Sequence, residues 1–396
     1  MVNARLINIE NINSANREIL KTGADKSSLQ WLSPKAVHVC IKLEGIIPYA
    51  ANILKQEMLG KGGDVAVHSG VVNCSVDASD VILMGTLNQY KRLTDKLLLQ
   101  SGTLREIALE VTEVLKGRTT EMVNTLELKG FNLPLGKKTY IMGILNVTPD
   151  SFSDGGSYTD IGAAVKKARE MITEGADIID IGGESTRPGH KPVDAQEEIK
   201  RVVPVIEILS REITCPISVD TMKAAVADKA LQAGAHAVND VWGLQREPEM
   251  ANIIAKHGAG VIMMHNQDNK DYVDLVGDII RFLRKSADIA EKAGIPRNRM
   301  VVDPGIGFGK TPEHNMEVMR RIREFSSINL PILLGTSRKS FIGYALDLPV
   351  EERLEGTAAT VVLGISGRVD IIRVHDVKEM ARVAKMTDAI VRSVYS

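Results

Sequence analysis

The sequence contains few cysteines and few aromatic residues. Its three cysteines, Cys40, Cys74 and Cys215, are widely spaced and odd in number, which excludes a disulfide framework and does not fit a cysteine-ligated metal cluster. A reducing, cytoplasmic location is therefore expected. Aromatic residues make up only 4% of the chain, so the sequence offers no stacking platform for single-stranded nucleic acid.

An excess of charge and long apolar runs are also missing. Lys and Arg number 49 against 50 Asp and Glu, a formal net charge of -1, whereas nucleic-acid binders usually carry a basic excess. A local basic site for a phosphate stays open. No apolar run approaches the roughly 18 residues of a membrane span, and residues 1–6 lack the apolar core of a signal peptide. We therefore expect neither a membrane nor a nucleic-acid partner.

The length of 396 residues suits two domains. Residues 1–125 are predicted to form a smaller α+β domain, with strands at 36–43, 64–72 and 81–84 and helices at 46–59 and 103–116. A capping box, Thr103 to Glu106, marks the start of the last helix. Residues 119–138 are expected to form a linker and a short hairpin. This region holds no recognisable catalytic motif, so a structural or assembly role is predicted for it.

Residues 126–396 form the second predicted domain, in which short apolar segments alternate with amphipathic ones. Near-continuous apolar strands between helices indicate a parallel sheet, and eight such units in about 250 residues match the size of a (β/α)8 barrel. A doubly wound open sheet is the alternative, but it does not predict polar residues at nearly every strand end. The expected strands are 139–145, 177–181, 216–220, 236–240, 260–265, 299–303, 331–335 and 370–374.

Polar side chains follow these strands, at the end where barrels carry their active sites. Asp220, Asn239 and Asp303 would bring two carboxylates and an amide into one mouth, able to accept N–H bonds from an aminopyrimidine-type ring. Lys339, Arg373 and His375 add positive charge beside them, and the last helix would direct its N-terminus to the same place. The mouth therefore suits a flat, donor-rich heterocycle that carries a phosphate or diphosphate. Taken singly, such residues can be helix caps, and Asp240 and Asp376 are candidates for that lesser role.

Two other signals fail on their spacing. The segment Gly305-Ile306-Gly307-Phe308-Gly309-Lys310-Thr311 is close to a phosphate-binding loop, but Pro304 stands where the first glycine is required. A barrel loop that uses glycine for close backbone approach is the better interpretation. The eight histidines are scattered without a zinc-binding pattern.

The motifs resemble those of the dihydropteroate synthase family over residues 138–392. The matching segments are Met142–Gly156, Asp180–Gly189, Ser337–Ser340 and Arg373–Val377. The resemblance implies a transferase of folate biosynthesis that condenses (7,8-dihydropterin-6-yl)methyl diphosphate with 4-aminobenzoate to 7,8-dihydropteroate and diphosphate, with Mg2+ as cofactor. It also implies a homodimer. The strand-five loop, His265 to Lys270, and the N-terminal domain depart from the family pattern.

The resemblance implies roles for individual residues. Asp220, Asn239, Asp303 and Lys339 would hold the pterin ring, with Phe308 also in the substrate site. Arg373 and His375 would surround the diphosphate, with Asn146 near the metal. Thr186, Arg187, Pro188 and Ser340 would form the aminobenzoate side, and Asp150 would belong to a mobile catalytic loop.

Two rival functions share the barrel. A pterin-binding methyltransferase that serves a corrinoid protein would not need the Thr-Pro-Asp-Ser loop at 148–151 or the Thr-Arg-Pro-Gly loop at 186–189. A catalytically silent pterin sensor predicts the loss of at least one of Asn146, Asp220, Lys339, Arg373 or His375, and all five are present. Barrels host many chemistries, so the site and not the fold must decide between these functions.

Overall fold

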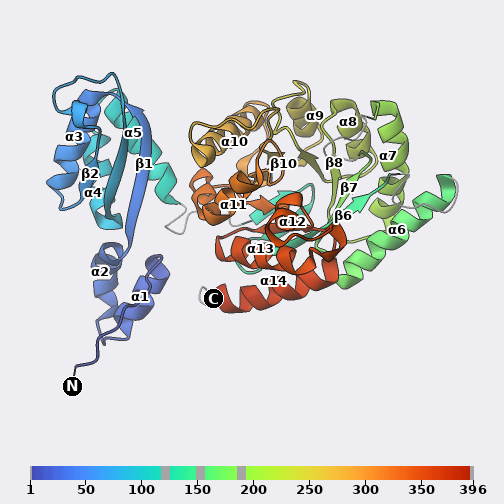
Figure 1. Cartoon of the computed structure of the whole chain (residues 1–396), viewed down its shortest axis with the longest axis horizontal. Coiled ribbons are helices and arrows are strands. Elements are labelled where there is room, and N and C mark those ends of the chain that lie inside the picture. Colours follow the sequence, from blue (N-terminus) through green and yellow to red (C-terminus); the bar gives the residue numbers. More distant parts are fainter. Residues whose placement is uncertain (1, 117–124, 149–156, 185–192, 393–396) are drawn as a thin grey trace. The chain divides into compact units, whose positions relative to one another are not determined.

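The computed structural model describes residues 2–116, 125–148, 157–184 and 193–392 (Figure 1). The chain divides into two compact units, Met1–Met122 and Val123–Ser396. Each has its own apolar core, built from separate sets of buried side chains. No helix among the described residues is long and apolar enough to cross a membrane.

The N-terminal unit is an α+β fold around a three-stranded antiparallel sheet in the order β1-β3-β2. Its strands are β1 (His38–Ile46), β2 (Asp64–Ala66) and β3 (Ser79–Thr86). Its helices are α1 (Ile12–Leu20), α2 (Leu29–Ala36), α3 (Pro48–Leu59), α4 (Leu87–Leu97) and α5 (Thr103–Lys116). The expected α+β class is confirmed.

Three details of this unit differ from the sequence-based expectation. The strand predicted at 64–72 ends at Ala66, because the His68 imidazole accepts a hydrogen bond from the Gly70 amide (3.0 Å) and starts a 3-10 turn. Helices α1, α2 and α4 were not predicted. Thr103 is the first residue of α5 and not its cap, since the Gly102 carbonyl accepts the Glu106 amide at 3.2 Å.

The C-terminal unit is a parallel eight-stranded barrel surrounded by helices, as predicted. The strands are β6 (Tyr140–Asn146), β7 (Ile178–Gly182), β8 (Ile217–Asp220), β9 (Ala237–Asp240), β10 (Gly260–Met264), β11 (Met300–Asp303), β12 (Leu333–Leu334) and β13 (Ile371–Val374). The helices are α6 (Ser157–Glu174), α7 (Ala195–Glu212), α8 (Ala224–Gln232), α9 (Met250–Lys256), α10 (Leu275–Lys292), α11 (Pro312–Arg320), α12 (Ser340–Leu346), α13 (Leu354–Ser366) and α14 (Val377–Val391).

The sheet closes on itself, which rules out the open doubly wound alternative. Its strand order runs from β11 through β6 to β13 and β12. A parallel bridge between Val302 and Ile332, with the Val302 amide 2.9 Å from the Pro331 carbonyl, joins the two end strands. The outward-facing residues of the strands pack against the helices in the largest apolar cluster of the chain.

A hairpin plugs the N-terminal end of the barrel. It consists of β4 (Thr125–Leu128) and β5 (Phe131–Pro134). Leu126 and Leu128 are fully buried against the inward-facing residues at the lower end of the strands: Tyr140, Met142, Ile178, Ala237, Ile262, Val301, Leu333 and Ile371. The fit is close, because a Cβ added to Gly260 would lie 2.4 Å from Leu128 Cδ2. The described residues therefore close the barrel at its N-terminal end.

Candidate active site

The interior of the barrel changes from apolar to largely polar within two residues along the strands, with polar side chains on five of the eight. Side chains on a strand alternate between faces, so positions two residues beyond the apolar layer also face inward. These positions are Ile144, Asp180, Asn239, Met264, Asp303, Gly335 and Arg373, joined by Ser218, which pairs in register with Asp180. A largely polar layer of side chains therefore lies next to the apolar layer inside the barrel.

Arg373 ties two of the carboxylates together. Its Nε donates to Asp180 Oδ2 and its Nη2 donates to Asp220 Oδ2, both at 2.6 Å. The Asn239 side-chain amide also donates to Asp180 Oδ2 (3.1 Å). Burial alone would lower the pKa of Arg373, but Asp180 and Asp220 together raise it above its ordinary value. Burial raises the pKa of Asp220 to about 7, with Arg373 opposing the rise and Asp180 adding to it.

Three buried oxygen atoms in and next to this layer lack a hydrogen-bond partner among the described residues: Asp180 Oδ1, Ser218 Oγ and Asp220 Oδ1. They lie on the adjacent strands β7 and β8. A buried polar atom without a partner costs about 1–3 kcal/mol, so native proteins rarely leave several together. The grouping indicates a surface made to receive hydrogen-bond donors from a ligand.

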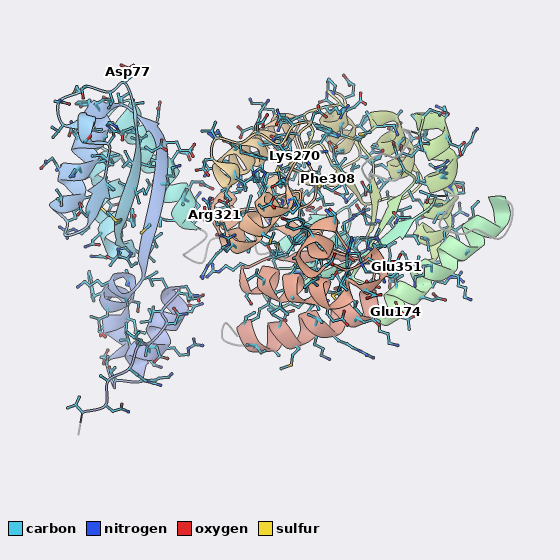
Figure 2. The ribbon with its side chains drawn as sticks, in the orientation of Figure 1. Asp77, Glu174, Lys270, Phe308, Arg321 and Glu351 are labelled. Atoms are coloured by element: carbon cyan, nitrogen blue, oxygen red, sulfur yellow. The ribbon has the colours of Figure 1, made fainter. Side chains whose placement is uncertain are left out.

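Lys339 and Phe308 lie together beside Asp303. The Lys339 ammonium donates to the Ile306 carbonyl and lies 4.5 Å from the centre of the Phe308 ring; Figure 2 labels Phe308 on the barrel unit. A Cβ added to Gly335 would be 4.0 Å from both Asp303 Oδ2 and Lys339 Nζ, so this glycine keeps the space between them open. Burial raises the pKa of Asp303, and Lys339 opposes the rise. Burial lowers the pKa of Lys339 to about 8, and Asp303 opposes that fall.

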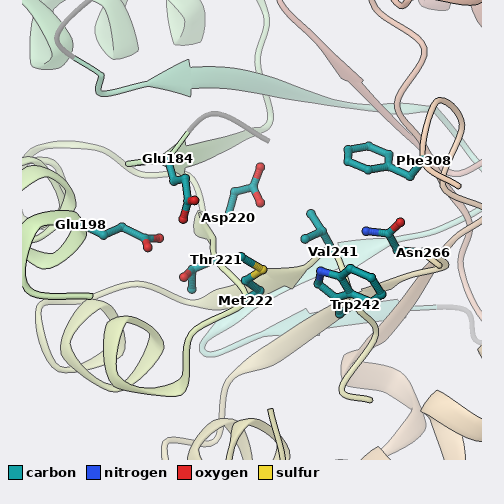
Figure 3. A pocket seen from close by; sticks show the side chains of 9 residues that line it. All are labelled: Glu184, Glu198, Asp220, Thr221, Met222, Val241, Trp242, Asn266 and Phe308. Atoms are coloured by element: carbon teal, nitrogen blue, oxygen red, sulfur yellow. The ribbon is translucent and has the colours of Figure 1, made fainter. Parts of the chain in front are cut away.

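A cavity of about 150 Å3 adjoins these groups. Figure 3 shows Phe308 and Asn266 at one side of it, Asp220 near the middle and Glu198 at the other side. Its remaining lining residues are Glu184, Thr221, Met222, Val241 and Trp242. Carboxylates at one place and an aromatic face at another are what a flat, donor-rich ring requires.

Glycines shape the loop that follows β11. Gly305, Gly307 and Gly309 have φ of +70°, +83° and +56°. A Cβ on Gly305 would lie 1.9 Å from the His265 carbonyl oxygen, and one on Gly307 would lie 2.9 Å from Lys339 Cδ. The predicted close approach of backbone in this segment is confirmed.

The metal position predicted at Asn146 lies at the end of β6. Asn146, Gly182, Asp220 and Asn239 form one row across four strands. A Cβ on Gly182 would lie 3.7 Å from Asn146 Oδ1 and 3.9 Å from Asp220 Oδ2, so the missing side chain leaves space beside the amide oxygen. Among the described residues no group of three His, Cys, Asp or Glu side chains could hold a metal ion. The residues at this position fit Mg2+ only in the way that is common for this ion, in which one protein oxygen, here that of Asn146, would act together with substrate phosphates and water.

The remaining predicted residues are distributed as follows. His375 follows β13, and its amide donates to Ser337 Oγ (3.1 Å). Ser340 is exposed at the start of α12. Asp150, Thr186, Arg187 and Pro188 lie outside the described residues.

Both suspected caps turn out to organise loops. Asp240 accepts the amides of Trp242 (2.9 Å) and Leu244 (2.7 Å) and so organises the turn after β9, but it caps no helix, because α9 begins at Met250 after Glu249. Asp376 makes no side-chain cap for α14. It accepts two hydrogen bonds from Arg338, from Nε at 2.9 Å and from Nη2 at 2.5 Å. Arg338 has a φ of +57°, so this ion pair holds a strained backbone between Ser337 and Lys339.

Sequence reasoning missed two groups of residues. Asp180 lies inside an apolar strand and not at its end, although it shares its parity with Ile178 and therefore faces inward. Lys223 donates to Glu184 and, at 2.5 Å, to the buried Glu198, and so places an ion-pair cluster against the cavity. Nothing in the spacing of these three residues along the chain predicts that contact.

Comparison with known proteins identifies the class. A family model described as pterin binding enzyme matches residues 142–375, more than half of the chain. The chain therefore belongs to the family of pterin-binding enzymes. Residues 142–375 run from β6 to the end of β13, so the match spans the whole set of barrel strands.

Within that family, the similar proteins are dihydropteroate synthases. The one from Clostridium beijerinckii is 54% identical over 265 residues, which cover 67% of this chain and 98% of that protein. The crystal structure of dihydropteroate synthase from Clostridium difficile in the presence of pteroic acid is also 54% identical, with a TM-score of 0.65, and covers 66% of this chain and 99% of its own.

A longer match includes part of the N-terminal unit. The probable bifunctional folylpolyglutamate synthase/dihydropteroate synthase of Haloferax volcanii is 43% identical over 344 residues, covering 83% of this chain and 40% of that protein. That share of this chain is larger than the barrel unit, so the similarity extends into residues 1–122.

Proposed function

We propose that this chain is a transferase that condenses (7,8-dihydropterin-6-yl)methyl diphosphate with 4-aminobenzoate, forming 7,8-dihydropteroate and diphosphate for folate biosynthesis. The observation that carries this proposal is the group of buried oxygen atoms without partners at Asp180, Ser218 and Asp220. A pterin edge is rich in N–H donors and would satisfy them. Relatives of the same length as the barrel carry this activity in their names.

The pterin ring would be held by Asp220, Asn239, Asp303 and Lys339, with Phe308 against it. The pKa of Asp220 is raised to about 7, so the carboxylate that accepts N–H bonds is the main form above neutral pH, and protonation at lower pH removes it. Asp303 already accepts the Gly305 amide on Oδ1 (2.7 Å), and its other oxygen faces the space beside Gly335. A ligand without N–H donors would leave the carboxylate oxygens of Asp220 and Asp303 unpaired, so the site would select for rings that carry such donors.

Departure of diphosphate requires its charge to be balanced. We assign this to Arg373 and His375, and Asn146 would hold Mg2+. The metal, when bound, supplies Lewis-acid stabilisation of the leaving group. Positive groups placed where charge grows act most strongly in a water-poor site. In the free protein Arg373 is already oriented by Asp180 and Asp220.

In this reaction the bond from the pterin methylene carbon to diphosphate oxygen breaks, and the carbon forms a bond to the arylamine nitrogen, which then loses a proton. The amine is nucleophilic as it stands, so positioning and exclusion of water carry most of the catalysis. Thr186, Arg187, Pro188 and Ser340 are proposed for the aminobenzoate side, and Asp150 for the loop that covers the reacting atoms.

We also propose a homodimer in the cytoplasm. Exposed apolar side chains gather on the adjacent helices α13 and α14: Val362 is 42% exposed, Leu363 47%, Met386 63% and Ile390 61%. A second copy of this chain is the proposed cover for them. All three cysteines are free thiols, in keeping with a reducing compartment.

The decisive experiment measures diphosphate release from (7,8-dihydropterin-6-yl)methyl diphosphate by the purified chain, with and without 4-aminobenzoate and Mg2+. Release that depends on both, with dihydropteroate as product, is the expected result. Folded protein that binds the pterin but releases no diphosphate would contradict the proposal. Sedimentation of the chain beside a Leu363→Glu, Ile390→Glu variant tests the dimer, and an unchanged mass for the variant would count against it.

A further inference from the structure

Lys310 is a buried lysine whose three hydrogen bonds all stay within one corner of the barrel mouth. It is 6% exposed. Its ammonium donates to the carbonyls of Gly305 and Phe308, both at 3.0 Å, and its Nζ lies 2.9 Å from His265 Nδ1. An ammonium has three donors, so these three acceptors match it fully. None of them is a carboxylate.

Such an arrangement is costly and therefore needs a reason. Burial lowers the pKa of Lys310 to about 7, with Asp303 opposing the fall and Lys339 adding to it. Burial, with Lys310 as a second cause, lowers the pKa of His265 to about 2, so the imidazole stays neutral and can accept. The His265 ring is fixed from its other side by an edge contact with Phe282, at 4.8 Å between centroids. A methionine could fill the same volume without desolvating a charge.

The hydrogen bonds of Lys310 connect both ends of the Gly305–Phe308 loop to His265, next to strand β10. Gly305 and Phe308 belong to the glycine-rich loop after β11, whereas His265 directly follows β10. The same loop offers the Ile306 carbonyl and the Phe308 ring to Lys339. The loop conformation that Lys310 fixes is thus the one that orients Lys339.

We propose that Lys310 is a positioning residue for ring recognition: by tying the Gly305–Phe308 loop to His265, it holds Phe308 and the Lys339 ammonium in the geometry that binds a pterin. The inference rests on the proposed function only in taking a pterin as the ligand of this mouth. It assigns to Lys310 no contact with the substrate.

The test compares Lys310→Met with Asp388→Ala in the full chain. Asp388 is a matched control because it also makes three side-chain hydrogen bonds, to the Thr139 amide (2.6 Å), the Thr139 hydroxyl (2.8 Å) and Arg392 Nε (2.7 Å). These lie at the plugged end of the barrel. Both variants are expected to lower Tm, since both lose the same number of hydrogen bonds.

The readout is calorimetric binding of 6-hydroxymethylpterin, with 4-aminobenzoate KM as a second measure. Lys310→Met is expected to weaken pterin binding about tenfold or more and to leave the 4-aminobenzoate KM within about twofold, whereas Asp388→Ala should leave both unchanged. A lowered Tm with wild-type pterin affinity in Lys310→Met would overturn the inference.

A second variant keeps the test decisive if Lys310→Met does not fold. His265→Phe removes one acceptor and retains the ring contact with Phe282, so pterin affinity should fall by a smaller factor; unchanged affinity there would also overturn the inference. Wild-type chain that binds the pterin but makes no dihydropteroate would refute the proposed reaction alone, because the binding comparison stands without catalysis.

Discussion

Replacing Arg373 by methionine should destabilise the barrel in a strongly pH-dependent way. The guanidinium bridges Asp180 and Asp220 at 2.6 Å each, and both carboxylates are buried. Removing one partner of a buried charge cluster costs about 3–5 kcal/mol, because charge is left uncompensated. Methionine fills much of the same volume, so the cavity term is small.

The pH dependence follows from the direction of the Asp220 pKa shift. Its pKa is already raised to about 7 with Arg373 present, and loss of the cation must raise it further. A carboxyl with a raised folded-state pKa keeps its proton in the folded chain, so stability is lost as pH rises through that value. We expect Arg373→Met to cost about 3–5 kcal/mol near pH 8 and roughly 1 kcal/mol near pH 4.5, where the Asp220 carboxyl is protonated and less charge is left uncompensated.

The measurement is urea unfolding at the two pH values, followed by the fluorescence of Trp242. The chain has two tryptophans, and Trp31 is 66% exposed in the other unit. A Trp31→Phe background therefore makes Trp242 a reporter of the barrel alone. Adding Asp180→Asn to Arg373→Met should recover at least half of the loss at pH 8. An equal loss at both pH values, or no recovery, would refute the reasoning from uncompensated charge.

Four further outcomes are expected. The kcat/KM for the pterin substrate should be bell-shaped, rising through the pKa of Asp220 at about 7 and falling through that of Lys339 at about 8; a profile that is flat across this range would contradict both roles. Lys339→Met should raise the pterin Kd at least about tenfold by titration calorimetry, and wild-type affinity would exclude it from the site. Gly307→Ala should weaken pterin binding, because φ is +83° and the new Cβ would press on Lys339 Cδ, whereas Gly136→Ala, at φ +84° in open space, should lower Tm alone. Deleting residues 1–122 should leave kcat within about threefold in a steady-state assay. The dihydropteroate synthase of Clostridium beijerinckii aligns over 98% of its own length with only 67% of this chain, which is about the size of the barrel unit. Loss of activity in a folded barrel would assign the N-terminal unit a catalytic part.

Most of the barrel was predictable because two local signals agree in it. Near-continuous apolar strands and amphipathic helices alternate, and polar residues follow the strands, so both the fold class and residues such as Asp220 and Asp303 could be inferred. Asp180 escaped because it stands within the apolar segment, where only the pairing register shows that it faces the interior. Register depends on the shear of the closed sheet, which local sequence does not encode.

The N-terminal unit was predicted less completely than the barrel. Helix α4 carries buried residues at Leu87, Tyr90, Leu93 and Leu97, a helical spacing, and begins with a capping box between Thr86 and Gln89. Its signal was thus present in the sequence. The overlong strand at 64–72 arose because the turn at His68 depends on a side-chain bond that alternation cannot show. Lys310 was unpredictable for another reason, since its acceptor His265 lies 45 residues away along the chain.

The hairpin of β4 and β5 closes the N-terminal end of the barrel, and this closure bears on the order in which substrates bind and products leave. A molecule that enters by the mouth can leave only by the mouth, because Leu126 and Leu128 seal the other end. In the proposed assignment the pterin groups lie on the strands inside, whereas Ser340 is exposed at the rim. The substrate that binds deeper must therefore arrive first, and its product must depart last. Steady-state kinetics should accordingly be sequential and ordered, with 4-aminobenzoate as the second substrate.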